Sequence, residues 1–137
     1  MYNEILDGIV KKLQDLFPEM EIMIDPLREG EGKPCFHVGI TKSEEQPVNG
    51  NRYFRSIGVS IKYYPKEPGN ASREMNQVLA VLMDEFEYVL AESGSTFKGS
   101  SRNGTIEGGV LYFQVDYQIY ILKSHETEQS MENMKLM

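Results

Sequence analysis

The chain has 137 residues, 40% hydrophobic and 26% charged, which is enough for one globular domain that buries about two-thirds of the surface of its unfolded chain. Its formal charge is -7, with 21 acidic and 14 basic residues and no Lys/Arg run, which argues against nucleic acid or an anionic membrane as the main partner. Cys35 is the only cysteine, so no intrachain disulfide is possible, and no apolar stretch approaches the roughly 18 residues of a membrane span.

Residues 3–17 are predicted to form the first helix. Apolar side chains recur on one side of it at helical spacing: Ile5, Leu6, Ile9, Val10, Leu13, Leu16 and Phe17. Asn3 is a candidate N-cap, and Pro18 ends the helix because the residue before a proline avoids helical geometry. Gly8 costs about 1 kcal/mol relative to alanine inside a helix, so a close backbone contact is expected there.

Three strands are predicted between this helix and the next. Residues 20–25 form a short strand, and residues 35–41 form a second one after a polar, glycine-rich loop. Residues 42–51 are predicted to be a polar connection with a turn at Asn49-Gly50. The strand over 53–64 alternates most regularly, which predicts a sheet with one packed and one wet face. Its packed face consists of Arg55, Ile57, Val59, Ile61 and Tyr63.

Residues 70–94 are predicted to form a long central helix, capped by Asn70 and stopped by Gly94 in the left-handed conformation. Its apolar stripe consists of Met75, Val78, Leu79, Leu82, Phe86, Val89 and Leu90. On the opposite side of the helix, Val81 and Tyr88 lie seven residues apart. We expect this second face to contact a neighbouring subunit; the alternative is a chance scatter of exposed apolar residues.

A hairpin is predicted after this helix. Residues 96–101 begin its first strand, which is interrupted at Gly99 and resumes over 105–107. Gly108-Gly109 supplies a tight two-residue turn, and residues 110–123 return as a long strand.

The long strand over 110–123 presents two different faces. One is apolar and consists of Leu111, Phe113, Val115, Tyr117, Ile119 and Ile121. On the other face Tyr112 and Tyr120 lie among polar residues, a mixture that suits a surface in contact with protein. Residues 124–137 are polar with scattered methionines, and we expect a flexible tail.

The order of elements is therefore helix, three strands, helix and two strands. Both helices carry one apolar stripe and each strand one apolar face, which predicts an α+β two-layer sandwich. In this fold two helices pack on one face of a mostly antiparallel sheet of about five strands. The domain is expected to span residues 1–123, followed by the tail over 124–137.

Cys35 and His37 are the strongest candidates for chemistry, because they lie two residues apart on the same side of a strand. A catalytic Cys-His pair would need an orienting third group, and two ligands fall short of the four in a structural zinc site. The favoured alternative is a half-buried structural pair. We therefore predict no enzyme activity, no catalytic residue, no metal site and no cofactor.

Several motifs of the chain point to a family. They are the Lys98-Gly99-Ser100 start of the hairpin, Val110-Leu111 after its glycine turn, and the aromatic/polar alternation over 112–117. The N-terminal order of helix and strands, ending in Tyr63-Tyr64-Pro65, is similar too. In these features the chain resembles the small phage and prophage proteins known as tail terminators or minor tail proteins. It departs from that pattern at Gly108, where an acidic residue precedes the turn glycine in the family.

The resemblance implies a structural, non-enzymatic role. Such proteins form a ring, usually of six subunits, that caps a finished tail tube and joins it to the head. The implied partners are further copies of the chain, the tail tube protein and a head completion protein, with no membrane and no specific nucleic acid. The implied location is the cytoplasm of the bacterial host during assembly, and then the virion tail.

Three alternatives remain open at this stage. The first is another virion ring component, such as a head completion or connector protein. The second is a small-ligand-binding domain or an enzyme that uses Cys35 and His37. The third is an adaptor that docks its C-terminal residues into a partner.

Subunit contacts of a ring are expected at loops and strand edges, here residues 42–51, residues 98–103 and the segment after Ser124. The candidate interface residues of the chain are Glu45, Asn49, Val81, Tyr88, Lys98, Arg102, Asn103, Tyr112 and Tyr120.

Overall fold

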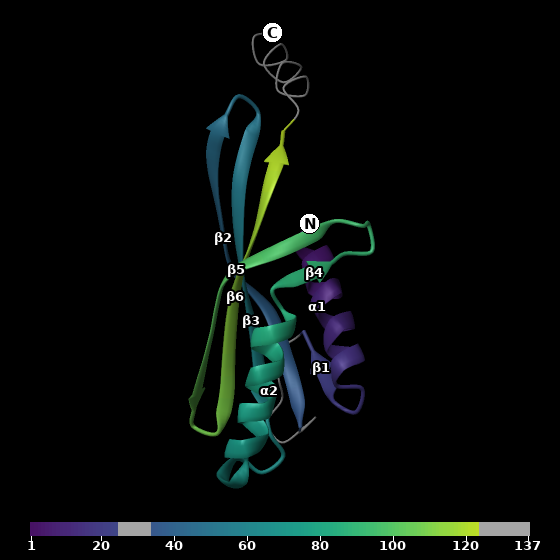
Figure 1. Cartoon of the computed structure of the whole chain (residues 1–137), viewed down its shortest axis with the longest axis vertical. Coiled ribbons are helices and arrows are strands. Elements are labelled where there is room, and N and C mark those ends of the chain that lie inside the picture. The colour runs from purple at the N-terminus through teal and green to yellow at the C-terminus, as the bar shows by residue number, and fades with distance from the viewer. Residues whose placement is uncertain (25–33, 124–137) are drawn as a thin grey trace.

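The structure, a computed structural model, describes residues 1–24 and 34–123 as two α-helices and a six-stranded sheet (Figure 1). Along the chain the elements are α1 (Tyr2–Leu16), β1 (Glu21–Met23), β2 (Cys35–Asn49), β3 (Arg52–Tyr64), the 3-10 helix η1 (Pro68–Asn70), α2 (Ser72–Glu85), β4 (Tyr88–Leu90), β5 (Thr96–Glu107) and β6 (Val110–Leu122). The strand order in the sheet is β1-β2-β3-β6-β5-β4.

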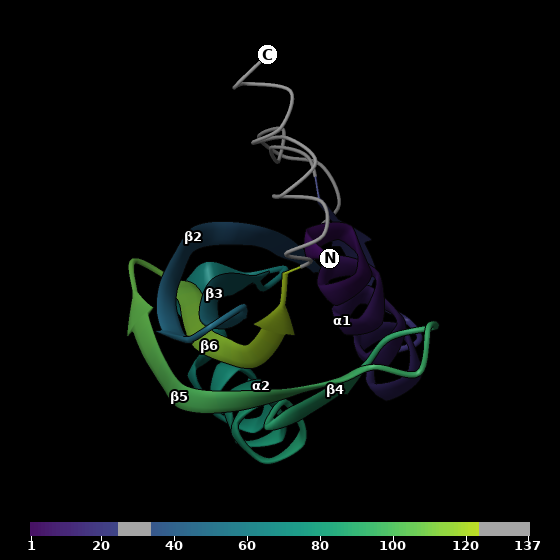
Figure 2. The same ribbon diagram turned by 90° about the horizontal axis from the view of Figure 1, so that it is seen from above.

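The predicted α+β class is confirmed, with corrections to the sheet. It has six strands instead of five, and it is mixed because β1 pairs with β2 in parallel while all other pairs are antiparallel. Both helices lie on the same side of the β2–β3–β6 strands, and the sheet curls around that side (Figures 1 and 2). The predicted arrangement of two helices on one face of the sheet is thus found with a curled sheet.

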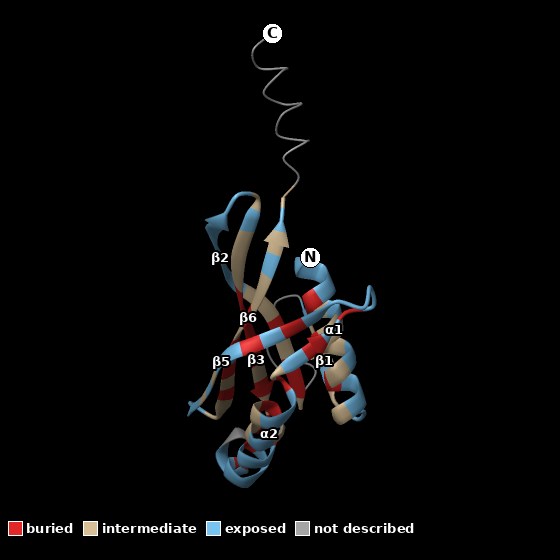
Figure 3. Cartoon of the chain, turned by 45° about the horizontal axis from the view of Figure 1, so that its top comes forward, coloured by how far each residue is buried: buried red, intermediate tan, exposed pale blue. Residues whose placement is uncertain are grey.

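The core lies between the helices and the sheet (Figure 3). The predicted apolar faces of β3 and β6 and the inner positions of both helices supply its fully or almost fully buried side chains. These include Ile5, Ile9, Leu13, Ile57, Val59, Ile61, Tyr63, Met75, Val78, Leu82, Leu111, Phe113, Val115 and Tyr117. Periodicity therefore identified most of the core correctly.

The prediction of one helix over 70–94 is wrong in its second half. Helix α2 ends at Glu85, and Val89 and Leu90 lie on the short strand β4, where Val89 is buried and Leu90 exposed. A short apolar run such as 88–90 fits a helical stripe and a strand alternation equally well, so periodicity alone could not decide. Gly94 does take a positive φ of 94°, but in the turn between β4 and β5.

The predicted helix caps at Asn3 and Asn70 are also wrong. Helix α1 begins one residue earlier, so that Asn3 lies inside its first turn, and Asn70 belongs to η1. The residues at the two N-cap positions are Met1 and Ala71, and neither helix has a side-chain capping hydrogen bond.

Residues 42–51 are not a loop, because β2 continues through them to Asn49. Its second half pairs with β3, from Lys42 opposite Gly58 to Asn49 opposite Arg52. The sequence did not predict this part of the strand, because both of its faces are exposed to solvent and its side chains show no apolar alternation. Pro47 is tolerated because β1 pairs only with Cys35–His37 and leaves this part of β2 at an edge. The turn predicted at Asn49-Gly50 is confirmed by the positive φ of Gly50.

The interruption predicted at Gly99 is a β-bulge inside one strand, β5, which runs on to Glu107. A Cβ atom at Gly99 would lie 2.8 Å from Cγ2 of Val115 and 3.2 Å from the Phe86 carbonyl oxygen. The bulge therefore needs glycine so that β5 can bend past the end of α2. At the other end of β5, Gly108 and Gly109 both have positive φ, as the predicted tight turn requires.

The close contact expected at Gly8 is confirmed. A Cβ atom there would lie 2.7 Å from Cγ1 of Val89 and 3.0 Å from the Leu90 carbonyl oxygen. Glycine thus lets helix α1 pack directly against β4, which compensates for its poor helix propensity.

We expect Gly8→Ala to lower the free energy of unfolding by about 1 kcal/mol, because overpacking against Val89 outweighs the gain in helix propensity. Urea unfolding monitored by circular dichroism measures this change. Gly69→Ala is the control, since an added Cβ has no neighbour within 4 Å and should be neutral. A stabilised Gly8→Ala protein would show that α1 can move away from β4 without cost.

Candidate protein-binding surfaces

The face of the sheet opposite the helices carries polar side chains and a few aromatic rings. Its residues include His37, Gln46, Phe54, Ser56, Ser60, Lys62, Tyr112, Gln114, Gln118 and Tyr120. A shallow pocket of about 270 Å³ on this face is lined by His37, Ser60, Lys62 and Gln114 among others. The prediction of one packed and one wet sheet face is confirmed.

The most prominent feature is a three-stranded arm, which we define as residues 42–56 and 118–123. It begins where a bulge in β2 follows Ile40, and it extends beyond both helices (Figure 1). Three of its apolar side chains are exposed: Val48 by 50%, Tyr120 by 65% and Leu122 by 70%. The Tyr120 ring lies on the Phe54 ring, with centroids 5.0 Å apart. The arm therefore presents apolar surface to solvent without a core of its own.

A charge cluster holds the three strands of the arm together. The Glu45 carboxylate on β2 accepts hydrogen bonds from Arg55 on β3 at 2.6 Å and from Lys123, just after β6, at 2.5 Å. These two partners, Lys123 more than Arg55, hold the pKa of Glu45 below its usual range. The Lys123 ammonium also lies 4.2 Å from the ring centroid of Tyr53.

Helix α1 braces the base of the arm through Tyr2. Its ring lies beneath the Arg55 guanidinium, 5.7 Å from centroid to Cζ, and its hydroxyl is 2.7 Å from Oγ of Ser43. The arm is therefore fixed relative to the helices and presents its apolar residues in one orientation.

The Glu45 cluster predicts a pH dependence for the arm. The folded-state pKa of Glu45 is lowered. The stabilisation that its carboxylate gives to the arm is therefore complete above the ordinary pKa of 4.5, and it is lost as the pH falls through the lowered pKa. We expect amide hydrogens of the arm, measured by hydrogen exchange relative to those of the core strands, to lose protection over that range. Glu45→Gln should remove this dependence. Glu44→Gln, which changes an exposed carboxylate 3.9 Å from Lys42, should retain it.

A second surface is a groove between α1 and β4, which we call the β4 groove. It has a volume of about 440 Å³ and is lined by Gly8, Lys11, Lys12, Asp15, Tyr88, Leu90 and Thr96. Tyr88 and Leu90 are 49% and 66% exposed. The Lys12 ammonium donates to the Tyr88 carbonyl oxygen at 2.9 Å, which fixes the edge of β4 against the helix. The groove is thus formed by the same close packing that requires Gly8.

Arg102 connects the end of α2 to the bulge of β5. Its guanidinium donates to the carbonyl oxygens of Met83 at 3.2 Å and of Gly99 at 3.1 Å. Because Met83 lies in the last turn of α2, the cation also complements the negative end of the helix dipole. Its role in a contact between subunits stays a prediction, and within the subunit it joins two elements.

The structure separates the remaining candidate interface residues into groups. Glu45, Asn49 and Tyr120 lie on the arm, whereas Tyr88 on β4 pairs with Lys98 on β5. Asn103 and Tyr112 lie near the hairpin turn between β5 and β6, where Asn103 pairs with Gln114 and Tyr112 with Thr105.

The predicted pairing of Val81 and Tyr88 on one helix face is wrong. Val81 lies on α2, but the helix ends before Tyr88, which belongs to a strand. Tyr88 is exposed as expected, although its neighbours are the β4 groove and Lys98 instead of a helical stripe.

The two candidates for chemistry differ in burial. Cys35 is fully buried and His37 half-buried, and no group of three His, Cys, Asp or Glu residues that could hold a metal occurs within 1–24 and 34–123. In the same part of the chain, neither helix is long and apolar enough to cross a membrane.

Comparison with known proteins assigns the chain to a family. A family model described as phage tail terminator protein matches residues 4–129. The chain belongs to the phage tail terminator family. No curated protein matches this tail terminator. One solved structure with a similar chain is 16% identical over 90% of this chain and 96% of its own, with a TM-score of 0.47.

The family match confirms the resemblance drawn from the hairpin motifs and covers the arm, the β4 groove, α2 and all but the first two residues of α1. Tail terminators are structural phage proteins, so this chain is a structural component of the phage tail. For a tail terminator, surfaces that bind other tail proteins are the expected functional sites.

Proposed function

We propose that the protein caps the completed tail tube as a ring of identical subunits, for which six is the expected number. In this role it terminates the tube, binds the tube protein on one side and joins the tail to a head completion protein on the other. Assembly takes place in the cytoplasm of the bacterial host, and the ring then remains in the virion tail.

The observation that carries this proposal is the family match over residues 4–129. Two features of the subunit support it. The arm and the β4 groove are separate, exposed surfaces, as a ring subunit needs for its two neighbours. The acidic chain, with a charge of -7, suits binding to protein and passage of DNA without tight binding.

The test is a light-scattering series over protein concentration, followed by electron microscopy with polymerised tail-tube protein. We expect rings at tube ends, also if the protein in solution stays monomeric, because many weak contacts gain from multivalency on the tube. A protein that never binds tube ends would contradict the proposal. Binding to head connectors in place of tubes would favour another ring component of the virion.

A further inference from the structure

We propose that the arm of one subunit binds in the β4 groove of the next copy. The inference rests on the proposed ring and names the surfaces that would form it.

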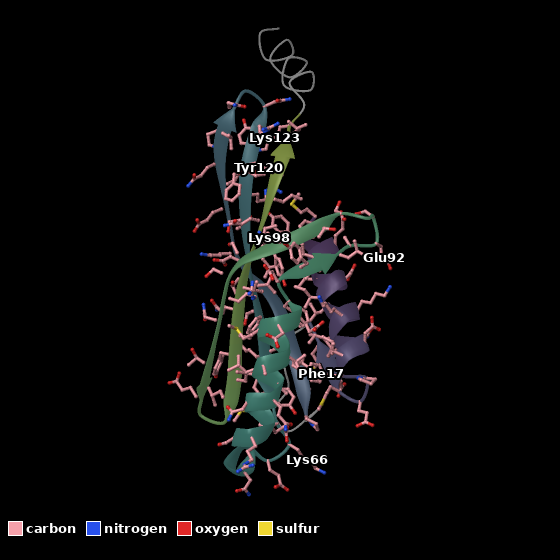
Figure 4. All side chains as sticks on the ribbon, in the orientation of Figure 1. Phe17, Lys66, Glu92, Lys98, Tyr120 and Lys123 are labelled. Carbon is pink, nitrogen blue, oxygen red and sulfur yellow. The ribbon has the colours of Figure 1, made fainter. Side chains whose placement is uncertain are left out.

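The arm supplies an exposed apolar edge that is left uncovered by residues 1–24 and 34–123 of its own subunit. Val48, Tyr120 and Leu122 are half or more exposed, while the Glu45 cluster and Tyr2 fix the arm in place. Tyr120 and Lys123 lie far from Glu92, at the turn beside the groove, in the same molecule (Figure 4). Because the arm is braced in that orientation, a second copy is required to bring these side chains to a groove.

The β4 groove offers the complementary shape. Its floor at Gly8 has no side chain, and Tyr88 and Leu90 present exposed apolar surface beside it. A second hollow of about 360 Å³ shares Gly8, Lys11 and Leu90 and extends the groove towards Glu92. The combined concavity is bordered by β4, the strand that sequence periodicity assigned to a helix.

The charges of the two surfaces are also complementary. The arm has more bases than acids, with Lys42, Arg52, Arg55 and Lys123 against Glu44 and Glu45. The residues that line the β4 groove and the adjoining hollow have more acids than bases, with Asp7, Asp15 and Glu92 against Lys11 and Lys12. None of these three acids forms an ion pair within the described residues. Arg52 at the tip of the arm is exposed and is a candidate partner for them.

This contact is heterologous, because different surfaces of the two copies meet. A heterologous contact leaves one arm and one groove free in every dimer, so it repeats until the rotation closes a ring. A second copy therefore explains both surfaces at once, whereas a tube protein as the occupant would explain only one.

Cysteine cross-linking in the full-length chain tests the inference. Leu122→Cys marks the arm and Leu90→Cys marks the groove, and the native Cys35 is buried. With a short bismaleimide, and with polymerised tail-tube protein present, we expect no dimer from either variant alone, a dimer from their mixture, and a ladder of oligomers from the double variant. Asn76→Cys, at an exposed position on α2, is the control and should not cross-link to Leu122→Cys.

Dimers from Leu122→Cys alone would show that two arms meet each other and would overturn the proposal. The absence of a mixed dimer, while wild-type protein caps tubes as a ring, would overturn it and leave the proposed function intact. A mixed dimer without capping would support the contact and contradict the function. In capping assays, Leu122→Asp and Leu90→Asp should each reduce capped tube ends at least tenfold, whereas Asn76→Asp should not; unchanged capping by both aspartate variants would overturn the inference.

Discussion

Replacing Phe86 by alanine is expected to lower the free energy of unfolding by about 3–5 kcal/mol, which could remove much of the stability of a domain of this size. Phe86 is fully buried, and the Lys12 ammonium lies 5.4 Å from its ring centroid. Its side chain fills the space where α2 ends and the chain turns into β4. Truncation therefore leaves a cavity under the β4 groove, and denaturant unfolding measures the loss.

Tyr88→Ala is the matched control, because this aromatic residue lies two positions further and is half exposed. Its removal should change stability by about 0.5 kcal/mol or less. If the two variants differ by less than 1 kcal/mol, the surrounding side chains collapse into the space of Phe86 and the end of α2 is less rigid than the packing indicates. We also expect Phe86→Ala to cap tubes poorly even at temperatures where it stays folded, since β4 loses its support.

The sequence predicted the core better than the surfaces, and the reason is physical. Burial imposes periodicity, so strands such as β3 and β6 and the buried positions of α1 could be recognised from alternation and spacing. The second half of β2 has no buried side chain beyond Ile40, so the sequence predicts a polar connection over residues 42–51 in place of a strand. Strand pairing by backbone hydrogen bonds leaves no such signal in composition.

The candidate surfaces could be predicted only in part for a related reason. The sequence predicts Tyr120, Asn49 and Glu45 as contact residues, but their common location on one arm depends on the pairing of β2, β3 and β6. The β4 groove was missed because residues 88–90 fit the stripe of the preceding helix. One signal was present: Gly8 inside a helix indicated that a backbone passes close to α1, and that backbone is β4.

Replacing Tyr117 by phenylalanine is expected to lower the free energy of unfolding by about 1–3 kcal/mol, although it removes a single oxygen atom. The Tyr117 hydroxyl donates to the Phe86 carbonyl oxygen at 2.8 Å, and both residues are fully buried. Without this donor the carbonyl is left in the core, where water cannot replace the bond. Burial raises the pKa of Tyr117 above its usual range, so the hydroxyl stays protonated and the difference should be constant between pH 6 and 9.

Tyr63→Phe separates this effect from the mere loss of a tyrosine hydroxyl. The Tyr63 ring is as buried as that of Tyr117, but its hydroxyl donates to the carboxylate of Glu74, an exposed residue of α2. Water can solvate that carboxylate in the variant, so we expect a loss below about 1 kcal/mol. If Tyr63→Phe is as destabilising as Tyr117→Phe, the cost arises from the loss of a tyrosine hydroxyl in itself, and the bond to Phe86 has no special role in holding the end of α2 against the sheet. If only Tyr117→Phe is destabilising, that bond connects the core to the strand that borders the β4 groove.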